Sequence, residues 1–114
     1  IYVCAGSDNE TAGAEMANIA AGYFSTPVYS DFLKWMGYTN EAEAILEGFR
    51  ERDRAKSLGA FTPEVLHKLG IIGDPDHCRR GIAEYAGAGV DVPVIAPGAE
   101  NPEAYQSTLN AFTR

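Results

Sequence analysis

The sequence holds 114 residues, of which 46% are hydrophobic and 22% are charged. This composition is typical of a globular chain of at most one domain, and it excludes fibrous and disordered classes. Nine basic and 16 acidic residues give a net charge of −7, which disfavours nucleic acid and anionic membranes as partners. No stretch approaches the ~20 apolar residues of a membrane helix and no signal-type segment is visible, so we expect a cytoplasmic protein without membrane association.

The beginning of the chain predicts a strand followed by a helix. Ile1–Ala5 is a short, β-branched apolar run of the kind found in buried parallel strands. Apolar residues then recur at three- and four-residue spacing over about residues 10–24, which predicts an amphipathic helix. Because the chain opens with Ile1 instead of Met, inside a core strand, we expect it to be part of a longer protein.

Four of the six prolines mark predicted helix starts. Each follows a residue whose side-chain oxygen can accept a hydrogen bond from a free backbone N–H, while proline itself lacks an N–H that would have had no partner. The four pairs are Thr26-Pro27, Thr62-Pro63, Asp74-Pro75 and Asn101-Pro102. The first predicted helix has an apolar stripe at Val28, Phe32, Trp35 and Met36. A capping box at Asn40–Glu43 predicts one more helix start, and Gly70 is expected to close the Thr62 helix with positive φ.

Strands are few by comparison. Val90–Ile95 predicts a second strand, and Ile71-Ile72 is a weak third. One βα unit therefore begins the chain and another ends it, with a mostly helical insertion at about 26–70. So few strands do not make a stable sheet alone. We therefore expect strands from a missing N-terminal segment or from another copy of the chain, which would make a homo-oligomer.

No self-sufficient catalytic motif is present in the chain. Gly87–Gly89 lies between a predicted helix and a strand, which favours a chain reversal over a dinucleotide-binding loop. Asp74 is explained by capping and Cys78 by a core position, so the cluster with His77 predicts no metal site. His67 has no carboxylate or thiol nearby in sequence and is interpreted as a surface or structural histidine. Both cysteines are interpreted as reduced core residues.

The best-placed polar residues follow the two main strands. In parallel α/β folds, ligands bind at the carboxyl ends of the strands. Arginines of the charged run 50–56 could reach an anionic ligand at the same rim. The candidate rim residues are Ser7, Asp8, Asn9, Arg50, Arg54, Pro97 and Gly98. Two alternatives stay open: Asp8 or Asn9 caps the helix that follows, and the charged run is a solvated helix face with ion pairs.

The second half of the chain resembles a known family. Ile71–Tyr85, with its G-D-P-D helix start, and Ala88–Pro97 are similar to the C-terminal end of the luciferase-like monooxygenase superfamily, most closely its F420-dependent oxidoreductases. Ile1–Ala5 and the pattern from Pro27 to Gly37 resemble the seventh strand of that family and the helices after it.

The resemblance implies an α/β fold that is the C-terminal fragment of a TIM barrel, mostly helical, with two or three short parallel strands in residues 1–114. It further implies hydride transfer between F420, or alternatively FMN, and an organic substrate, without a metal. The family's cofactor contacts come mostly from earlier strands, so no catalytic residue is assigned here. The isolated chain is expected to bind no cofactor and to be inactive. The alternatives are an FMN-dependent monooxygenase and a non-catalytic α/β module that oligomerises.

Overall fold

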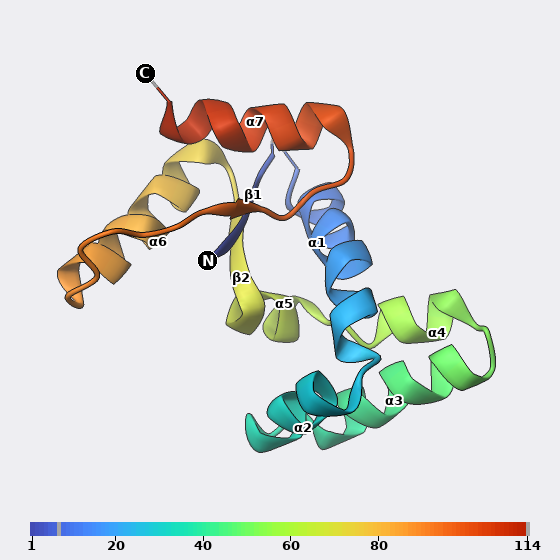
Figure 1. The fold of residues 1–114 in the computed structure, drawn as a ribbon. Coiled ribbons are helices and arrows are strands. Elements are labelled where there is room, and N and C mark those ends of the chain that lie inside the picture. Colours follow the sequence, from blue (N-terminus) through green and yellow to red (C-terminus); the bar gives the residue numbers. More distant parts are fainter. Residues whose placement is uncertain (7, 114) are drawn as a thin grey trace.

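The structure, a computed structural model, describes residues 1–6 and 8–113. Figure 1 shows a small parallel sheet with helices on both faces and a group of helices that projects to one side. In chain order the elements are β1 (Tyr2–Ala5), α1 (Asn9–Phe24), α2 (Pro27–Trp35), α3 (Thr39–Arg50), α4 (Arg54–Gly59), α5 (Pro63–Leu69), β2 (Gly70–Gly73), α6 (Pro75–Gly87), β3 (Ala96–Pro97) and α7 (Pro102–Phe112).

The sheet has the strand order β2-β1-β3, and both neighbours of β1 run parallel to it. Tyr2 pairs with Gly70 on one side and with Ala96 on the other. The weak third strand of the sequence is therefore confirmed, and it pairs with β1 along four residues. Gly70 is extended, with φ −162°, so the expected positive φ is wrong. Glycine is needed there because a Cβ would lie 2.8 Å from the Tyr2 carbonyl oxygen.

Alternate residues of β1 face two different layers. Val3 and Ala5 pack with Cys78 of α6 and Ala111 of α7, whereas Cys4 packs with α1. Both thiols are fully buried, as expected, and burial raises the pKa of each to about 11. Helices thus cover both faces of the sheet, which is the usual environment of parallel strands.

The mostly helical α/β fold with three short parallel strands is confirmed, but its strand order differs from that expected of a barrel segment. In a (β/α)8 barrel, consecutive strands pair and helices form only the outer ring. Here β3 returns to β1, where the Ala96 N–H donates to the Ile1 carbonyl at 2.9 Å and the Gly98 N–H donates to the Val3 carbonyl at 2.7 Å. The side of β1 opposite β2 is open to β3 because no earlier strand of this chain occupies it.

The predicted strand at Val90–Ile95 is wrong in its position, because β3 is Ala96–Pro97. Val92 and Val94 are 77% and 74% exposed, and Pro93 has no N–H to donate. Hydrogen bonding to the first strand segment starts only at Val94, whose carbonyl accepts from the α-amino group of Ile1 at 2.8 Å. The Gly87–Gly89 reversal is confirmed, with Gly89 at φ +104°.

Three of the four predicted proline helix starts have the expected cap. Thr62 accepts from the Val65 N–H at 3.3 Å, and Asp74 accepts from the His77 N–H at 2.8 Å. Asn101 accepts from two N–H groups of α7, at 2.8 and 3.3 Å. The Thr26 side chain makes no cap bond, because its hydroxyl donates backward to the Tyr23 carbonyl at 2.7 Å.

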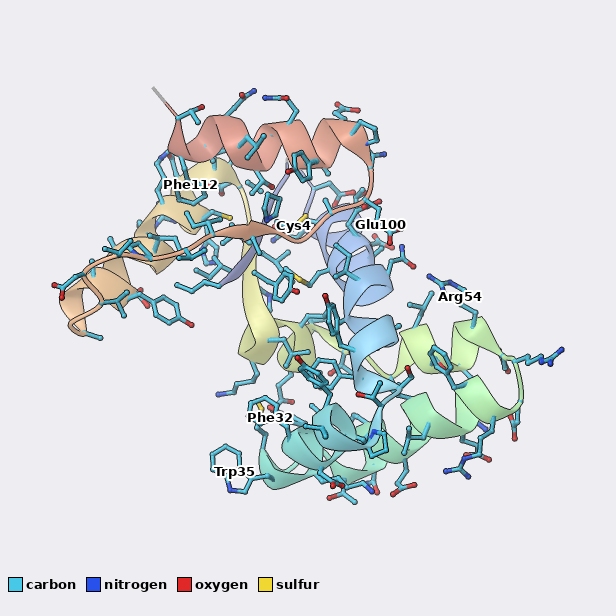
Figure 2. The ribbon with its side chains drawn as sticks, in the orientation of Figure 1. Cys4, Phe32, Trp35, Arg54, Glu100 and Phe112 are labelled. Carbon is cyan, nitrogen blue, oxygen red and sulfur yellow. The ribbon has the colours of Figure 1, made fainter. Side chains whose placement is uncertain are left out.

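The helical region α2–α4 departs most from the sequence patterns. In α2 the buried residues are Ser30 and Leu33, whereas Val28 and Trp35 are 77% and 81% exposed, so the predicted apolar stripe is not its packing face. Figure 2 shows Phe32 and Trp35 at the outer side of α2. Their rings stack on each other with centroids 6.0 Å apart.

Two further predictions about this region differ from the structure. The capping box does not form, since α3 begins at Thr39 and Glu43 instead pairs with Lys34 at 2.6 Å. The charged run 50–56 is not one helix face, because α3 ends at Arg50 and the chain turns through Arg52, whose φ is +55°. The expected ion pairs are present, since Lys56 pairs with Glu47 at 3.1 Å and with Glu51 at 3.2 Å. Within the residues that the structure describes, no helix is long and apolar enough to cross a membrane.

Candidate functional site

In the loop after β1, the structure assigns Asp8 to helix capping. Its Oδ1 accepts from the Glu10 N–H at 3.0 Å, and its Oδ2 accepts from the Thr11 hydroxyl at 2.7 Å. These hydrogen bonds, with that of Thr11 the strongest, lower the pKa of the Asp8 carboxyl because they favour its charged form. The capping alternative is therefore confirmed for Asp8. Ser7 lies outside the described residues.

The loop after β3 is packed against β1 and α1. Pro97 is in register with Val3, and a Cβ at Gly98 would lie 2.5 Å from the Met16 methyl group. Glycine therefore leaves room here for the end of the Met16 side chain of α1. Pro97 and Gly98 serve strand pairing and packing, and the structure does not bring them together with Asn9 around one cavity.

A carboxylate that sequence reasoning did not single out fixes the start of α7. Glu15 Oε2 accepts from the backbone N–H groups of Glu100 and Asn101, at 2.9 and 3.0 Å. It satisfies N–H groups at a helix start, where intrahelical partners are missing. The loop after β3 is therefore tied to α1 by side-chain hydrogen bonds as well as by packing.

The two candidate arginines take different positions. Arg54 Nη2 donates to Asn18 Oδ1 at 2.9 Å, and Asn18 lines the largest cavity described here. Arg54 is thus held beside the rim of that cavity. Arg50 is exposed at the end of α3 and does not line it.

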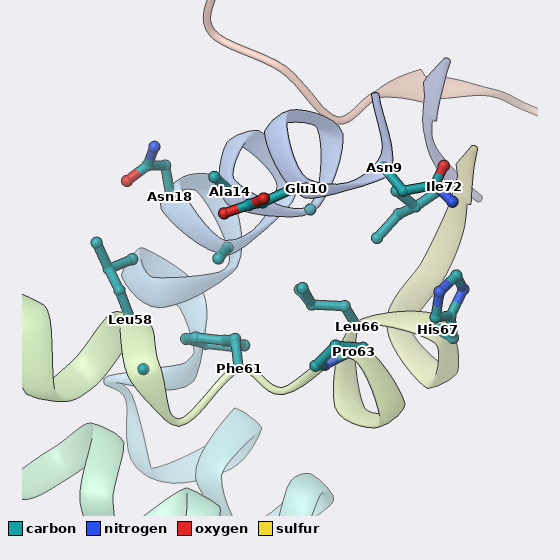
Figure 3. Close-up of a pocket in the computed structure, with 13 residues that line it drawn as sticks. Asn9, Glu10, Ala14, Asn18, Leu58, Phe61, Pro63, Leu66, His67 and Ile72 are labelled. Carbon is teal, nitrogen blue, oxygen red and sulfur yellow. The ribbon is translucent and has the colours of Figure 1, made fainter. Parts of the chain in front are cut away.

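The largest cavity among the described residues has a volume of about 650 Å³. It lies between α1, the α4–α5 connection and one face of α5 (Figure 3). We call it the α1–α5 pocket. Its lining consists of Asn9, Glu10, Gly13, Ala14, Ala17, Asn18, Leu58, Gly59, Phe61, Pro63, Leu66, His67 and Ile72. Of the candidate rim residues that the structure describes, only Asn9 lines it.

The pocket combines an apolar wall with a few polar groups. Figure 3 shows Phe61 and Leu66 facing α1 across the cavity, with His67 and Asn9 at one end and Asn18 at the other. Such a lining fits a planar organic ring, since most small-molecule sites are apolar with a few placed polar groups. It contains no lysine or arginine, so it offers no positive side chain to an anionic group. The described residues also contain no group of three or more potential metal ligands.

Sequence reasoning missed most of this pocket. Glu10 and His67 are 57 positions apart, and each looks unremarkable within its own helix. Only the pairing of β2 with β1 brings the end of α5 next to the start of α1. The one local signal was the Thr62-Pro63 helix start, which correctly places the apolar residues of α5.

The parallel sheet covered on both faces, with an apolar cavity beside the start of a helix that follows a strand, defines an α/β protein with a candidate ligand site. The sequence pattern of the luciferase-like monooxygenases matches residues 1–92, so the chain belongs to that family. It is similar to a curated Mycobacterium tuberculosis protein named "Putative coenzyme F420-dependent oxidoreductase Rv3520c", with 29% identity over 77 residues. That match covers 68% of this chain and 22% of the relative. The comparison with solved structures gives no match.

Proposed function

We propose that this chain is the C-terminal part of a luciferase-like oxidoreductase that transfers hydride between F420 and an organic substrate in the cytoplasm. The observation that carries the proposal is the family match over residues 1–92, together with the name of the similar mycobacterial protein. F420 supplies or accepts the hydride when bound. FMN is the alternative cofactor, because family membership alone does not choose between them.

In this proposal the α1–α5 pocket forms part of the substrate or cofactor-ring site. Phe61, Leu58 and Leu66 would exclude water from a ring held against α1, and exclusion of water limits side reactions of a reactive hydride donor. Asn9 and His67 offer hydrogen bonds at one end. The anionic tail would be bound by residues outside this pocket.

The proposal also includes a partner for the sheet, either the remainder of a barrel or a second copy of the chain. Among the described residues, β2 and β3 each have one strand neighbour, so each has an open edge. In a complete (β/α)8 barrel, β3 would pair with β2 instead of β1, and an earlier strand would pair with β1 in its place. The two-residue length of β3 supports such an exchange, since few hydrogen bonds would have to be replaced.

The test measures oxidation of reduced F420 and reduced FMN by two proteins, without oxygen and with a quinone as the organic hydride acceptor. One is the 114-residue chain, for which we expect neither turnover nor tight cofactor binding. The other joins this chain to the preceding part of the mycobacterial relative, for which we expect turnover of reduced F420. Tight binding of either cofactor by the chain alone would contradict the inactive-fragment proposal, and turnover with reduced FMN only would favour the alternative cofactor.

Within the joined protein, Ala14→Trp tests the pocket. Ala14 is exposed and lines the cavity, so the indole would fill it and lower kcat/KM for F420-dependent turnover by about tenfold or more. The matched control is Ala83→Trp, at an exposed position of α6 that lines none of the pockets described here. Equal activity of both variants would remove the pocket from the proposed site.

A non-catalytic module that oligomerises is the second candidate, and the exposed aromatic surface of α2 favours it. Phe32 and Trp35 are 46% and 81% exposed, which is unusual for large aromatic side chains. Sedimentation of the isolated chain separates the two proposals. A stable dimer that loses association on Trp35→Ser supports the module, whereas a monomer that melts cooperatively argues against borrowed strands.

A further inference from the structure

A second hollow, separate from most of the α1–α5 pocket, is lined by a lysine, an arginine and two histidines. It has a volume of about 280 Å³ and lies between the end of α5, the start of β2 and one face of α6. We call it the basic groove. Its lining consists of His67, Lys68, Gly70, Ile71, His77, Arg80, Gly81, Glu84 and Tyr85.

The charge of this groove is opposite to that of the whole chain. The net charge is −7, yet Lys68 and Arg80 face the same hollow as both histidines of the sequence. Glu84 is the one carboxylate in the lining. The carboxylate of Asp74 also lies close enough to Arg80 to interact with its charge. Its Oδ1, however, already accepts a hydrogen bond from the His77 N–H at 2.8 Å.

The basic side chains are available for a ligand. Within residues 1–6 and 8–113, the structure gives neither Lys68 nor Arg80 an ion pair, whereas Lys34, Lys56 and Arg79 are each paired. A lysine and an arginine can supply charge-assisted hydrogen bonds to an oxyanion, and those bonds are among the strongest in proteins. Glu84 alone does not neutralise the charges of Lys68 and Arg80.

The groove and the α1–α5 pocket share one residue. His67 lines both cavities, and Figure 3 shows it at the end of the pocket near Ile72. A ligand with an aromatic body and a charged group could therefore place its ring against Phe61 and its charge beyond His67. The two cavities offer complementary chemistry on the two sides of this imidazole.

We propose that the basic groove binds the phosphate group of an organic ligand whose ring occupies the α1–α5 pocket. This inference goes beyond hydride transfer, because it assigns a phosphate site whatever the cofactor or reaction. A phosphate dianion fits the groove better than a neutral group, since the lining holds the positive charges of Lys68 and Arg80 and two imidazoles that can donate hydrogen bonds.

Because the chain has only two histidines and both line the groove, NMR of their ring protons reports on it directly. Inorganic phosphate is titrated against chloride at constant ionic strength, so that screening is unchanged. A bound anion favours the protonated imidazoles, so phosphate should raise the pKa of both histidines and shift their resonances with one shared Kd. No shift, or a shift that does not saturate, would overturn the proposal.

Lys68→Gln and Arg80→Gln test the charge requirement. Each removes one charge-assisted contact and should weaken phosphate binding about tenfold or more, because such bonds contribute about 1.5–3 kcal/mol. Both positions are exposed, so the variants should fold as the parent chain does. Arg50→Gln is the matched control, with the same loss of charge at an exposed position that lines neither cavity. If all three variants weakened phosphate binding equally, the loss of affinity would come from the change in net charge, and the proposed site would be wrong.

Titrations with phenyl phosphate and with phenol then show whether the groove binds the phosphate group of an organic ligand or free phosphate. If the ring occupies the α1–α5 pocket, phenyl phosphate binds more tightly than inorganic phosphate, and Ala14→Trp removes only this gain. Equal affinity for the two phosphates would support the groove as a site for free phosphate and overturn the shared ligand. Phenol should leave the pKa of His77 unchanged, since it lacks the anion.

Discussion

The sheet region and the helical region α2–α4 are held together in different ways. In the sheet region, hydrogen bonds join residues far apart in sequence, such as the Ala5 N–H and the Thr108 hydroxyl at 2.9 Å. In the helical region the packing is between consecutive helices, and the buried Ser57 hydroxyl donates to the Ile45 carbonyl, 12 residues away. Figure 1 shows the sheet beside the upper part of α1 and the helices α2–α4 around its lower end. From this difference we predict that the helical region opens while the sheet region stays folded.

The helix α1 connects the two regions and forms one wall of the α1–α5 pocket. Met16 reaches the backbone at Gly70 and Gly98, where it contacts the sheet region. Phe24, at the other end, packs edge-to-face with Phe61 at a centroid distance of 6.1 Å. The pocket therefore lies where the sheet region and the helical region meet. Sites that change shape on ligand binding are often drawn from the less stable parts of a protein.

The largest expected effect comes from Leu33→Ala in the helical region. Leu33 is fully buried, and removing a large core side chain costs about 2–5 kcal/mol through lost transfer energy and the cavity left behind. We expect hydrogen exchange to accelerate in α2–α4 but to change much less in β1. The control is Val28→Ala on the same helix, which is 77% exposed and should have little effect. Equal acceleration in both regions would show that they unfold as one unit.

A smaller effect, confined to the sheet region, is expected for Thr108→Val. The Thr108 hydroxyl accepts from the Ala5 N–H and donates to the Ala104 carbonyl, both at 2.9 Å, in a fully buried position. Valine keeps the shape but leaves the Ala5 N–H unsatisfied, which costs about 1–3 kcal/mol. Denaturant unfolding measures the loss, and exchange should now accelerate in β1 and α7.

The control for this change is Thr39→Val at an exposed position in the helical region, where little stability should be lost. If Thr108→Val instead accelerated exchange mainly in α2–α4, the two regions would not be independent.

Sequence patterns predicted the sheet region better at its helix starts than at its strands. Asp74 and Asn101 mark caps because a cap is a local hydrogen bond, readable from neighbouring residues. The position of β3 could not be predicted, because it depends on which side of β1 is free. For the same reason the sequence predicted β2 only as a weak strand, since Ile71-Ile72 becomes a strand only through pairing with β1.

The helical region and the candidate site show the same limit. The stripe of α2 was misassigned because periodicity alone does not say which face meets α1 and α3, and Leu33 was left out of it. At the site, Asn9 was found because it follows a strand, whereas Phe61 and His67 become neighbours of α1 only through the fold. Arg50 was chosen for its charge and Gly98 because it follows a predicted strand, and the structure places both outside the pocket.

The smallest expected effect compares one helix start in each region. Asn101 accepts two N–H bonds at the start of α7, so Asn101→Ala should cost about 1 kcal/mol of unfolding free energy. Thr26 makes no cap bond to α2, so Thr26→Ala should cost clearly less, through loss of its bond to the Tyr23 carbonyl. Thermal unfolding of both variants measures the difference. A larger loss for Thr26→Ala would mean that the hydroxyl bond closing α1 matters more than a complete cap, and would place the weak point of the molecule at the α1–α2 junction.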